Sequence, residues 1–379
     1  MTNIPHEFSL AADTCHLNHA GIAPWPTRTV TAVTEFAIEN STHGSLRYPT
    51  WLATEQRLRA RLARLVGGDP ADIGLAKSTS EALSIIAYGL PWAPGDNIVG
   101  IAQEFPSNRI VWESLASRGV ALRQLDLDAS SSPEQDLIAL CDRATRLVAV
   151  SSVQYARGLR LDLEQLGAAC RARGIHLCID AIQSLGALPF DLRRINAQFV
   201  VADGHKWMLG PEGVALLYVA PPLRDQLQLH QFGWHMVAER GDFDRRDWTP
   251  AADATRFECG SPNMLGVYAL EASLSLLEEV GSATIAERIA ERVARLIELV
   301  DSHGFELLSP RAPGRRAGIV TFRVPGTPSP PLYRALMDQR VICAQRGGGI
   351  RFSPHFHTTE ETIERAMSLT AAAATGPDR

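Results

Sequence analysis

Two polar clusters stand directly after short apolar runs in the middle of the 379-residue sequence. In HLCIDAIQSLG the apolar run ends at Asp180, with Gln183 three residues later, and in FVVADGHKWMLGPEG a second run ends just before His205 and Lys206. Ligands of open parallel sheets bind beyond the carboxyl ends of the strands, so both clusters are expected at the same edge. The 26 positions from Asp180 to Lys206 are about the length of one helix and one strand, which allows the two side chains to converge on one ligand.

A carboxylate and an amine at one site suit a particular chemistry. A lysine amine forms an imine with an aldehyde cofactor, and a carboxylate at a pyridine nitrogen keeps that ring protonated as an electron sink. Lys206 and Asp180 can fill these two roles. Thr79 and Ser80, in KSTSEAL, begin a predicted helix, where free N–H groups and hydroxyls hold an anion such as a phosphate. The residues therefore predict an enzyme that carries pyridoxal phosphate (PLP).

The elements that must position these residues alternate in type. Between about residues 75 and 220, apolar runs alternate with amphipathic stretches, which predicts an α/β fold with a largely parallel sheet. Strands are expected at residues 97–102, 147–153, 176–179, 199–202 and 214–219, and helices at residues 81–88, 109–118 and 163–173.

The pattern changes near residue 262 to longer helices. These are expected at residues 267–280 and 283–303, followed by strands at 318–324 and 349–353 and helices at 331–338 and 360–374. We expect a large PLP-binding α/β domain over residues 16–261. A smaller α+β domain would comprise residues 262–379 together with the N-terminal residues 1–15.

Eight segments, taken together and in this order, resemble a known family. They are LNHAGIAPWP, STSEAL, QEFPSN, GLRLDLEQLG, IDAIQSLGALPFD, DGHKWMLGPEG, FECGSPN and GIRFSPHFHTTEE. The set is similar to the class V aminotransferases of PLP fold type I, which include cysteine desulfurases, selenocysteine lyases and isopenicillin N epimerase-like proteins. The similarity runs through most of the chain, and as a set the segments are highly specific.

The resemblance implies a role for each residue around the cofactor ring. Lys206 would be the Schiff-base lysine, and Asp180 would pair with the pyridinium nitrogen. Gln183 would reach the ring hydroxyl. Phe105, where many relatives have histidine, would stack on the ring.

The resemblance also implies which residues hold the phosphate and the substrate. Thr79, Ser80 and His205 would bind the phosphate. Ser261 lies in a segment that relatives contribute across a dimer interface, and it would touch the neighbouring subunit's phosphate. Arg351 matches the arginine that takes the α-carboxylate of the substrate, and a planar guanidinium suits that bidentate contact.

Three departures from the family bear on the reaction. Cysteine desulfurases carry a nucleophilic cysteine on a loop shortly before the arginine, whereas VICAQRGGGIR is too short for that loop and places Cys343 in an expected strand. Tyr155 stands where desulfurases have an asparagine beside the cofactor. Asp203 occupies a position where many relatives have a phosphate-contacting serine, and a carboxylate would repel a phosphate. Asp203 is therefore left out of the expected binding set.

The composition and charge of the chain argue against several kinds of binding partner. The formal net charge of −5 gives no basic stripe for nucleic acid, and no apolar run is long enough for a membrane helix. Six scattered cysteines without a CxxC pair indicate a cytoplasmic protein without disulfides. No GxGxxG follows an early strand, as a nicotinamide dehydrogenase would require, and no metal site is expected, because the pairs His16/His19 and His355/His357 lack further ligands at a fitting spacing.

These observations predict an aminotransferase-type enzyme that acts on an amino acid, a small-molecule substrate, and forms a homodimer with shared active sites. A C–S or C–Se β-lyase and an amino-acid epimerase use the same residues and remain alternatives. A non-catalytic PLP-binding protein is a remote alternative, because it would be expected to lack Lys206 or Asp180, and both are present.

Overall fold

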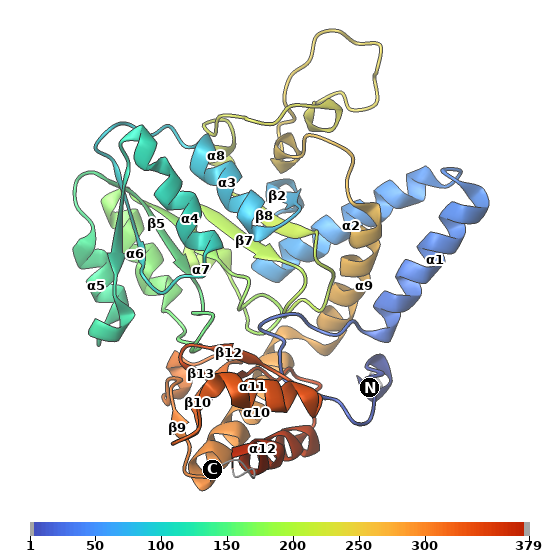
Figure 1. Ribbon diagram of the computed structural model, residues 1–379. Helices are drawn as coiled ribbons and strands as arrows, with labels where there is room; N and C mark the ends of the chain where they lie inside the picture. The colour runs from blue at the N-terminus through green and yellow to red at the C-terminus, as the bar shows by residue number, and fades with distance from the viewer. Residues whose placement is uncertain (1–3, 375–379) are drawn as a thin grey trace.

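A seven-stranded sheet forms the centre of the larger part of the computed structural model, which describes residues 4–374 (Figure 1). Its strand order is β2-β8-β7-β6-β5-β3-β4; β8 runs antiparallel to both neighbours, and the other pairs are parallel. The predicted α/β class with a mainly parallel sheet is confirmed. The strands are β2 (Ile73–Ala76), β3 (Asn97–Ile101), β4 (Ala121–Leu125), β5 (Thr145–Ser151), β6 (His176–Asp180), β7 (Phe199–Asp203) and β8 (Ala215–Val219).

Both faces of this sheet are covered, which explains why its strands read as continuous apolar runs. Alternate residues of a strand point to opposite faces. In β7, Val200 and Ala202 enter one hydrophobic core, while Phe199 and Val201 enter a second. The surrounding helices are α1 (Thr27–His43), α2 (Tyr48–Val66), α3 (Thr79–Gly89), α4 (Ser107–Glu113), α5 (Pro133–Leu140), α6 (Leu163–Arg173), α7 (Leu192–Ile195), α8 (Pro221–Arg224) and α9 (Met264–Val280).

A smaller, four-stranded antiparallel sheet lies beneath the large sheet in Figure 1, in the order β12-β13-β10-β9. The N-terminal β1 pairs in parallel with β11, so the start of the chain packs beside its C-terminal third. Helix α9 follows the expected domain boundary at residues 261 and 262, yet it packs against α1 and α2, which precede that boundary. The division into two domains at this point therefore stays a prediction. The remaining elements are β1 (Cys15–His16), α10 (Ser282–Ser302), β9 (Glu306–Leu307), β10 (Val320–Arg323), α11 (Ser329–Asp338), β11 (Val341–Ile342), β12 (Ala344–Arg346), β13 (Gly349–Phe352) and α12 (Glu360–Ala374).

Several elements differ from those expected, and no residue range was predicted for the helices α1, α2, α5, α7 and α8 or for the short strands β1, β9, β11 and β12. The predicted helix at residues 109–118 is instead α4 followed by a 3-10 helix, Ser114–Arg118. Two strands, β2 and β4, were not expected. The strand β4 lies at the sheet edge and is partly exposed, with Arg123 and Gln124 among its residues, so it lacks the apolar signature of the central strands. None of the helices within residues 4–374 is both long and apolar enough to cross a membrane.

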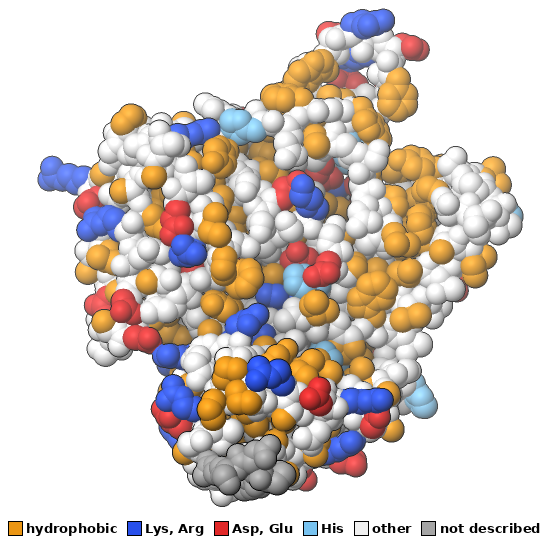
Figure 2. Space-filling view, in the orientation of Figure 1, with side chains coloured by type: hydrophobic (Ala, Val, Ile, Leu, Met, Phe, Trp, Pro, Cys, Tyr) orange, Lys and Arg blue, Asp and Glu red, His pale blue; other side chains and the backbone are white. Residues whose placement is uncertain are grey.

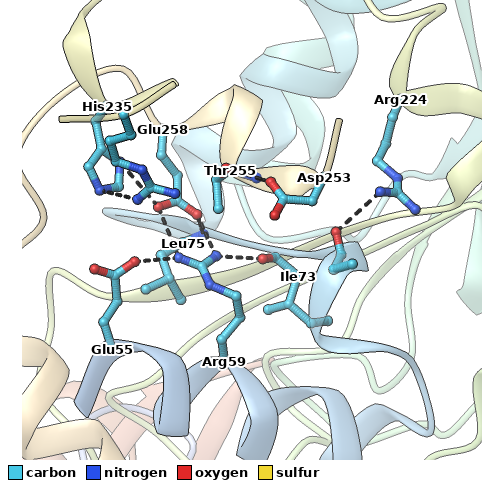
Figure 3. A network of polar contacts seen from close by, with 11 residues as sticks. Glu55, Arg59, Ile73, Leu75, Arg224, His235, Asp253, Thr255 and Glu258 are labelled. Atoms are coloured by element: carbon cyan, nitrogen blue, oxygen red, sulfur yellow. Dashed lines mark hydrogen bonds and ion pairs between the residues drawn. The ribbon is translucent and has the colours of Figure 1, made fainter. Parts of the chain in front are cut away.

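A buried ion-pair network joins α2 to β2 and to the segment before residue 259 (Figure 3). The guanidinium of Arg59 bonds to Glu55 Oε1 and Glu258 Oε1, each at 2.6 Å. Glu258 Oε1 also accepts a hydrogen bond from the backbone N–H of Leu75 at 2.9 Å. Removing one partner of a buried pair costs about 3–5 kcal/mol. The network therefore fixes the segment that leads to Ser261.

Glu55, Glu258 and His235 bring ligand atoms within 4.8 Å of one another, as a metal site would. However, Arg59 already forms ion pairs with both carboxylates. His235 Nε2 lies 2.7 Å from the Arg240 guanidinium. We therefore interpret this group as a structural ion-pair network.

Three histidines, of which His19 and His355 are buried and His357 is partly exposed, connect the N-terminal segment to the C-terminal one. His19 Nδ1 bonds to the Ser353 carbonyl at 2.9 Å, and its Nε2 lies 3.1 Å from His357 Nε2. His355 Nε2 bonds to the Trp207 carbonyl at 3.0 Å. Burial lowers the pKa of His355 to about 4 and the pKa values of His19 and His357 well below 6.5. All three are therefore neutral in the folded protein near neutral pH.

We expect the free energy of unfolding to fall as the pH drops from about 6.5 towards 4. Each of these histidines binds a proton more readily in the unfolded chain, so its contribution is complete above pH 6.5 and decreases by up to about 1.4 kcal/mol per pH unit below it. Urea unfolding at several pH values measures the slope. His355→Gln should make the slope shallower, and His303→Gln, at an exposed position, should not. An unchanged slope in His355→Gln would contradict this account.

Candidate active site

Lys206 and Asp180 lie in one buried pocket at the carboxyl ends of β7 and β6. Asp180 is the last residue of β6, and Lys206 follows the end of β7 by three residues. No ion pair joins them directly, although each influences the ionisation of the other. The Lys206 Nζ lies 5.5 Å from the centre of the Phe105 ring.

Burial shifts the ionisation of both charged groups. It lowers the pKa of Lys206 to about 8, a shift that the nearby Asp180 carboxylate opposes. It raises the pKa of Asp180 to about 6, because a buried carboxylate loses its hydration; the Ile182 N–H, 3.0 Å from Oδ1, and the charge of Lys206 oppose this shift. A cation brought against Asp180 would restore its ionised form.

Trp207 fixes the position of Lys206. Its buried indole donates to Gln183 Oε1 at 2.8 Å, and its carbonyl accepts from His355. The backbone passes so close that a Cβ on Gly186, which has a φ of +94°, would lie 2.2 Å from the Trp207 carbonyl oxygen. Gln183 also donates to the Ala20 carbonyl at 3.0 Å. The amide of Gln183 therefore keeps one free N–H for a ligand.

Phe105 is 39% exposed, which is unusual for its type, and its ring is available for stacking. Tyr155 packs edge-on against it, with ring centres 5.3 Å apart. The preceding residue, Glu104, is buried and accepts a 2.6 Å hydrogen bond from the Ser151 N–H. Burial raises the pKa of Glu104 to about 7. This contact fastens the Phe105 loop to the end of β5.

The first turn of α3 carries two hydroxyl side chains, those of Thr79 and Ser80. Ser78 caps the helix by accepting from the Glu81 N–H at 3.2 Å, which is the S-x-x-E arrangement of a capping box. Thr79 is buried, yet its Oγ1 has no hydrogen-bond partner among residues 4–374. Ser80 is exposed and donates to Ser107 Oγ at 2.8 Å. An unsatisfied buried hydroxyl beside free helix N–H groups fits a phosphate.

His205 and Asp203 lie together beside this pocket. Their Nδ1 and Oδ1 atoms are 3.0 Å apart but are not aligned for a hydrogen bond. The charge of Asp203 raises the pKa of both Asp180 and Lys206, so it acts on the same pocket.

Arg351 reaches the pocket from β13 of the small sheet. Its guanidinium is buried and donates to the Tyr155 carbonyl at 2.7 Å and to Asn18 Oδ1 at 3.1 Å. Among residues 4–374, no carboxylate pairs with it, and its Nε has no partner. Burial lowers the pKa of Arg351 to about 10. A buried cation without an anion is suited to bind the carboxylate of a ligand.

Ser261 lies at the surface beside Lys77 and Glu81, which flank Thr79 and Ser80 at the start of α3. It is exposed and shares a surface hollow with Lys77, Glu81 and Gly213. The residues that sequence reasoning did not assign are Asn18, Glu104 and Trp207. Asn18 and Trp207 lie within quoted family segments, LNHAGIAPWP and DGHKWMLGPEG, and Glu104 precedes Phe105 in QEFPSN, so the signal was their position in these segments.

The fold and this site define a class, the PLP-dependent enzymes that act on amino acids. The family model for class-V aminotransferases matches residues 15–365, and the chain belongs to this family. The resemblance found in the sequence is therefore confirmed. PLP is the cofactor of the protein.

Three known proteins illustrate the range of the relatives. Isopenicillin N epimerase of Streptomyces clavuligerus is 34% identical over 81% of both chains. A probable cysteine desulfurase of Methanothermobacter thermautotrophicus is 27% identical over 96% of this chain and 95% of its own. The structure of the cystine C–S lyase C-DES with its product cysteine persulfide matches with a TM-score of 0.87 and 25% identity, covering 95% of this chain and 98% of that one.

We expect Thr79→Val to weaken PLP binding about 5- to 10-fold. The substitution removes a hydroxyl that would bond to the charged phosphate, and the loss of that hydrogen bond costs about 1–1.5 kcal/mol. The stability of the cofactor-free protein should not fall, because Thr79 Oγ1 has no partner there. Titrating the cofactor-free protein with PLP measures the first effect, and thermal unfolding measures the second. Ser84→Ala, one turn further along α3, is the control. Equal PLP affinity in Thr79→Val would remove Thr79 from the site.

Proposed function

We propose that Lys206 binds PLP covalently and that the enzyme performs aminotransferase-type chemistry on an amino acid. The observation that carries the proposal is a buried lysine, with a pKa near 8, whose ionisation is affected by both the Asp180 carboxylate and the uncompensated Arg351 guanidinium. The pocket fits the cofactor. The Thr79 hydroxyl, which has no hydrogen-bond partner, would bond to the phosphate, and the exposed ring of Phe105 would stack on the cofactor ring.

Each residue of the pocket would perform one task. PLP, when bound, supplies the electron sink that allows the α-proton of the substrate to leave. Asp180 would hold a proton on the ring nitrogen, and Arg351 would bind the substrate α-carboxylate. The Lys206 amine, whose pKa lies close to physiological pH, would take the proton and return it. Phe105 and Tyr155 would exclude water from one side of the ring.

A C–S β-lyase is a second candidate, favoured by the similarity to C-DES. Persulfide formation on Cys343 finds no support, because this thiol is buried and burial raises its pKa to about 12. The thiolate is the nucleophilic form of cysteine. A β-elimination that needs no nucleophilic cysteine stays open, as does epimerisation, the reaction named for the relative from Streptomyces clavuligerus.

We also propose a homodimer in which Ser261 contributes to the partner's phosphate site. In support, Ser261 is exposed, so a second copy of the chain can reach it. Nearby, residues 232–248 extend away from the body of the molecule in Figure 1 and carry exposed aromatic side chains. These are Phe232, Trp234, Phe243 and Trp248. The six unpaired cysteines support a cytoplasmic location.

We expect Lys206→Ala to lose the absorbance of lysine-bound PLP and the label left by borohydride reduction, without unfolding. The sequence contains only two lysines, which makes the test unambiguous. Lys77 is exposed and pairs with Glu81, so Lys77→Ala should keep both signals. Amino acids added to the wild type should yield keto acid as the product. Pyruvate with sulfide would instead indicate the lyase, and a change of configuration the epimerase.

Mixed dimers test the shared site. Lys206→Ala chains and Ser261→Glu chains should each be inactive, because one lacks the amine and the other repels the phosphate. After subunit exchange, one site of each heterodimer would pair an intact Lys206 with an intact Ser261, and activity should return to about a quarter of the wild-type value in an equal mixture. That fraction assumes random pairing of two chain types. No recovery after proven exchange, or a fully active monomer by light scattering, would refute the arrangement.

A further inference from the structure

A second arginine, Arg346, lies on the same face of the small sheet as Arg351. In the antiparallel pair of β12 and β13, Ala344 stands opposite Arg351, and Arg346 stands opposite Gly349. Opposed residues project from one face, as do residues two apart along a strand. Arg346 and Arg351 are therefore diagonal neighbours. Gly349 has no side chain, and a Cβ there would lie 2.2 Å from the backbone oxygen of Phe322.

This face is turned towards the pocket of Lys206. Arg351 reaches from it to the Tyr155 carbonyl and to Asn18. The charge of Arg346 also lowers the pKa of both Arg351 and Lys206, as expected for a cation close to both. In Figure 2, Lys and Arg side chains gather where the small sheet meets the large one. The charge of Arg346 thus acts on the same site as that of Arg351.

Arg346 differs from its arginine neighbours in having no anionic partner. Arg157 and Arg323 flank the same turn, at residues 347 and 348, and they pair with Asp128 and Glu306. The side chain of Arg346 is exposed and donates only to the Gln345 carbonyl, at 2.9 Å. Within residues 4–374 no carboxylate lies within ion-pair distance of it. A cation without an anionic partner, whose charge acts on the ligand site, is available to the ligand.

We propose that Arg346 binds a second anionic group, on the side chain of the substrate, so that the substrate is an amino acid with an acidic side chain. This inference rests on the proposed function, in which Arg351 binds the α-carboxylate. Diagonal neighbours across a strand pair lie about 7–8 Å apart at their Cα atoms, and two long side chains can converge from that distance on the two ends of a small dicarboxylate. Arg346 then determines specificity, whereas Lys206 and Asp180 determine the chemistry.

The first test measures binding without reaction. Glutarate, a dicarboxylate, and butyrate, a monocarboxylate, are titrated into the PLP-loaded protein by calorimetry. Wild type should bind glutarate at least about tenfold more tightly, the equivalent of about 1.4 kcal/mol. Arg346→Gln should remove this difference, and Arg346→Lys should keep part of it. Arg323→Gln, which alters an exposed but paired arginine beside the same turn, should keep all of it.

The second test compares kcat/KM for matched amino acids. Glutamate should exceed glutamine, and aspartate should exceed asparagine. Arg346→Gln should lower the values for the acidic member of each pair by 10-fold or more, through KM, and leave the amide member unchanged. A substitution that merely disturbed the fold would lower both members equally.

Three results would overturn the role of Arg346: equal binding of glutarate and butyrate by the wild type, equal losses for acidic and amide substrates in Arg346→Gln, or the same loss in Arg323→Gln. The proposed function fails on a different observation, the absence of lysine-bound PLP absorbance in the wild type or its persistence in Lys206→Ala. Intact absorbance without discrimination between the two acids would contradict the substrate class alone.

Discussion

Opposite charges buried at the ends of adjacent strands constrain most of the large sheet. An isolated buried charge costs several kcal/mol, so Asp180 and Lys206 are tolerated only where the surrounding backbone is held firmly. The sheet provides this by ending β6 and β7 side by side. Trp207 provides the rest, because its indole and carbonyl are both bonded to distant segments. The smaller sheet is therefore needed to fix the lysine as well as to deliver Arg351.

Two buried arginines show how the same side chain can serve structure or ligand binding. Arg59 is surrounded by Glu55 and Glu258, so its charge is fully compensated within the chain. Arg351 is as deeply buried, yet it meets only a carbonyl and an amide oxygen. Burial accordingly lowers its pKa, whereas the two carboxylates around Arg59 raise the pKa of that guanidinium. The missing anion, rather than the arginine itself, marks the binding position.

Ligands of parallel sheets bind beyond the carboxyl ends of the strands, and this rule was enough to predict Asp180 and Lys206 from the sequence. Each of them follows an apolar run that is buried on both faces. The class of fold was predictable for the same reason. The edge strand β4 was missed because its partly exposed residues carry no such run. Asn18 and the pairing of Arg346 with Gly349 could not be deduced, since they depend on how separate segments meet. The roles of individual site residues likewise remain predictions that geometry supports.

The N-terminal segment crosses to the far end of the chain, and this has a consequence for biosynthesis. His19 bonds to Ser353, and Asn18 to Arg351, across 334 and 333 positions of sequence. Contacts this distant form only after almost the whole polypeptide has left the ribosome, although the large sheet can pair much earlier. A nascent chain would thus contain an assembled large sheet before the C-terminal residues that bring Arg351 to the substrate side of the site have been made. Cofactor capture could precede the closure of that side by the last residues to be made.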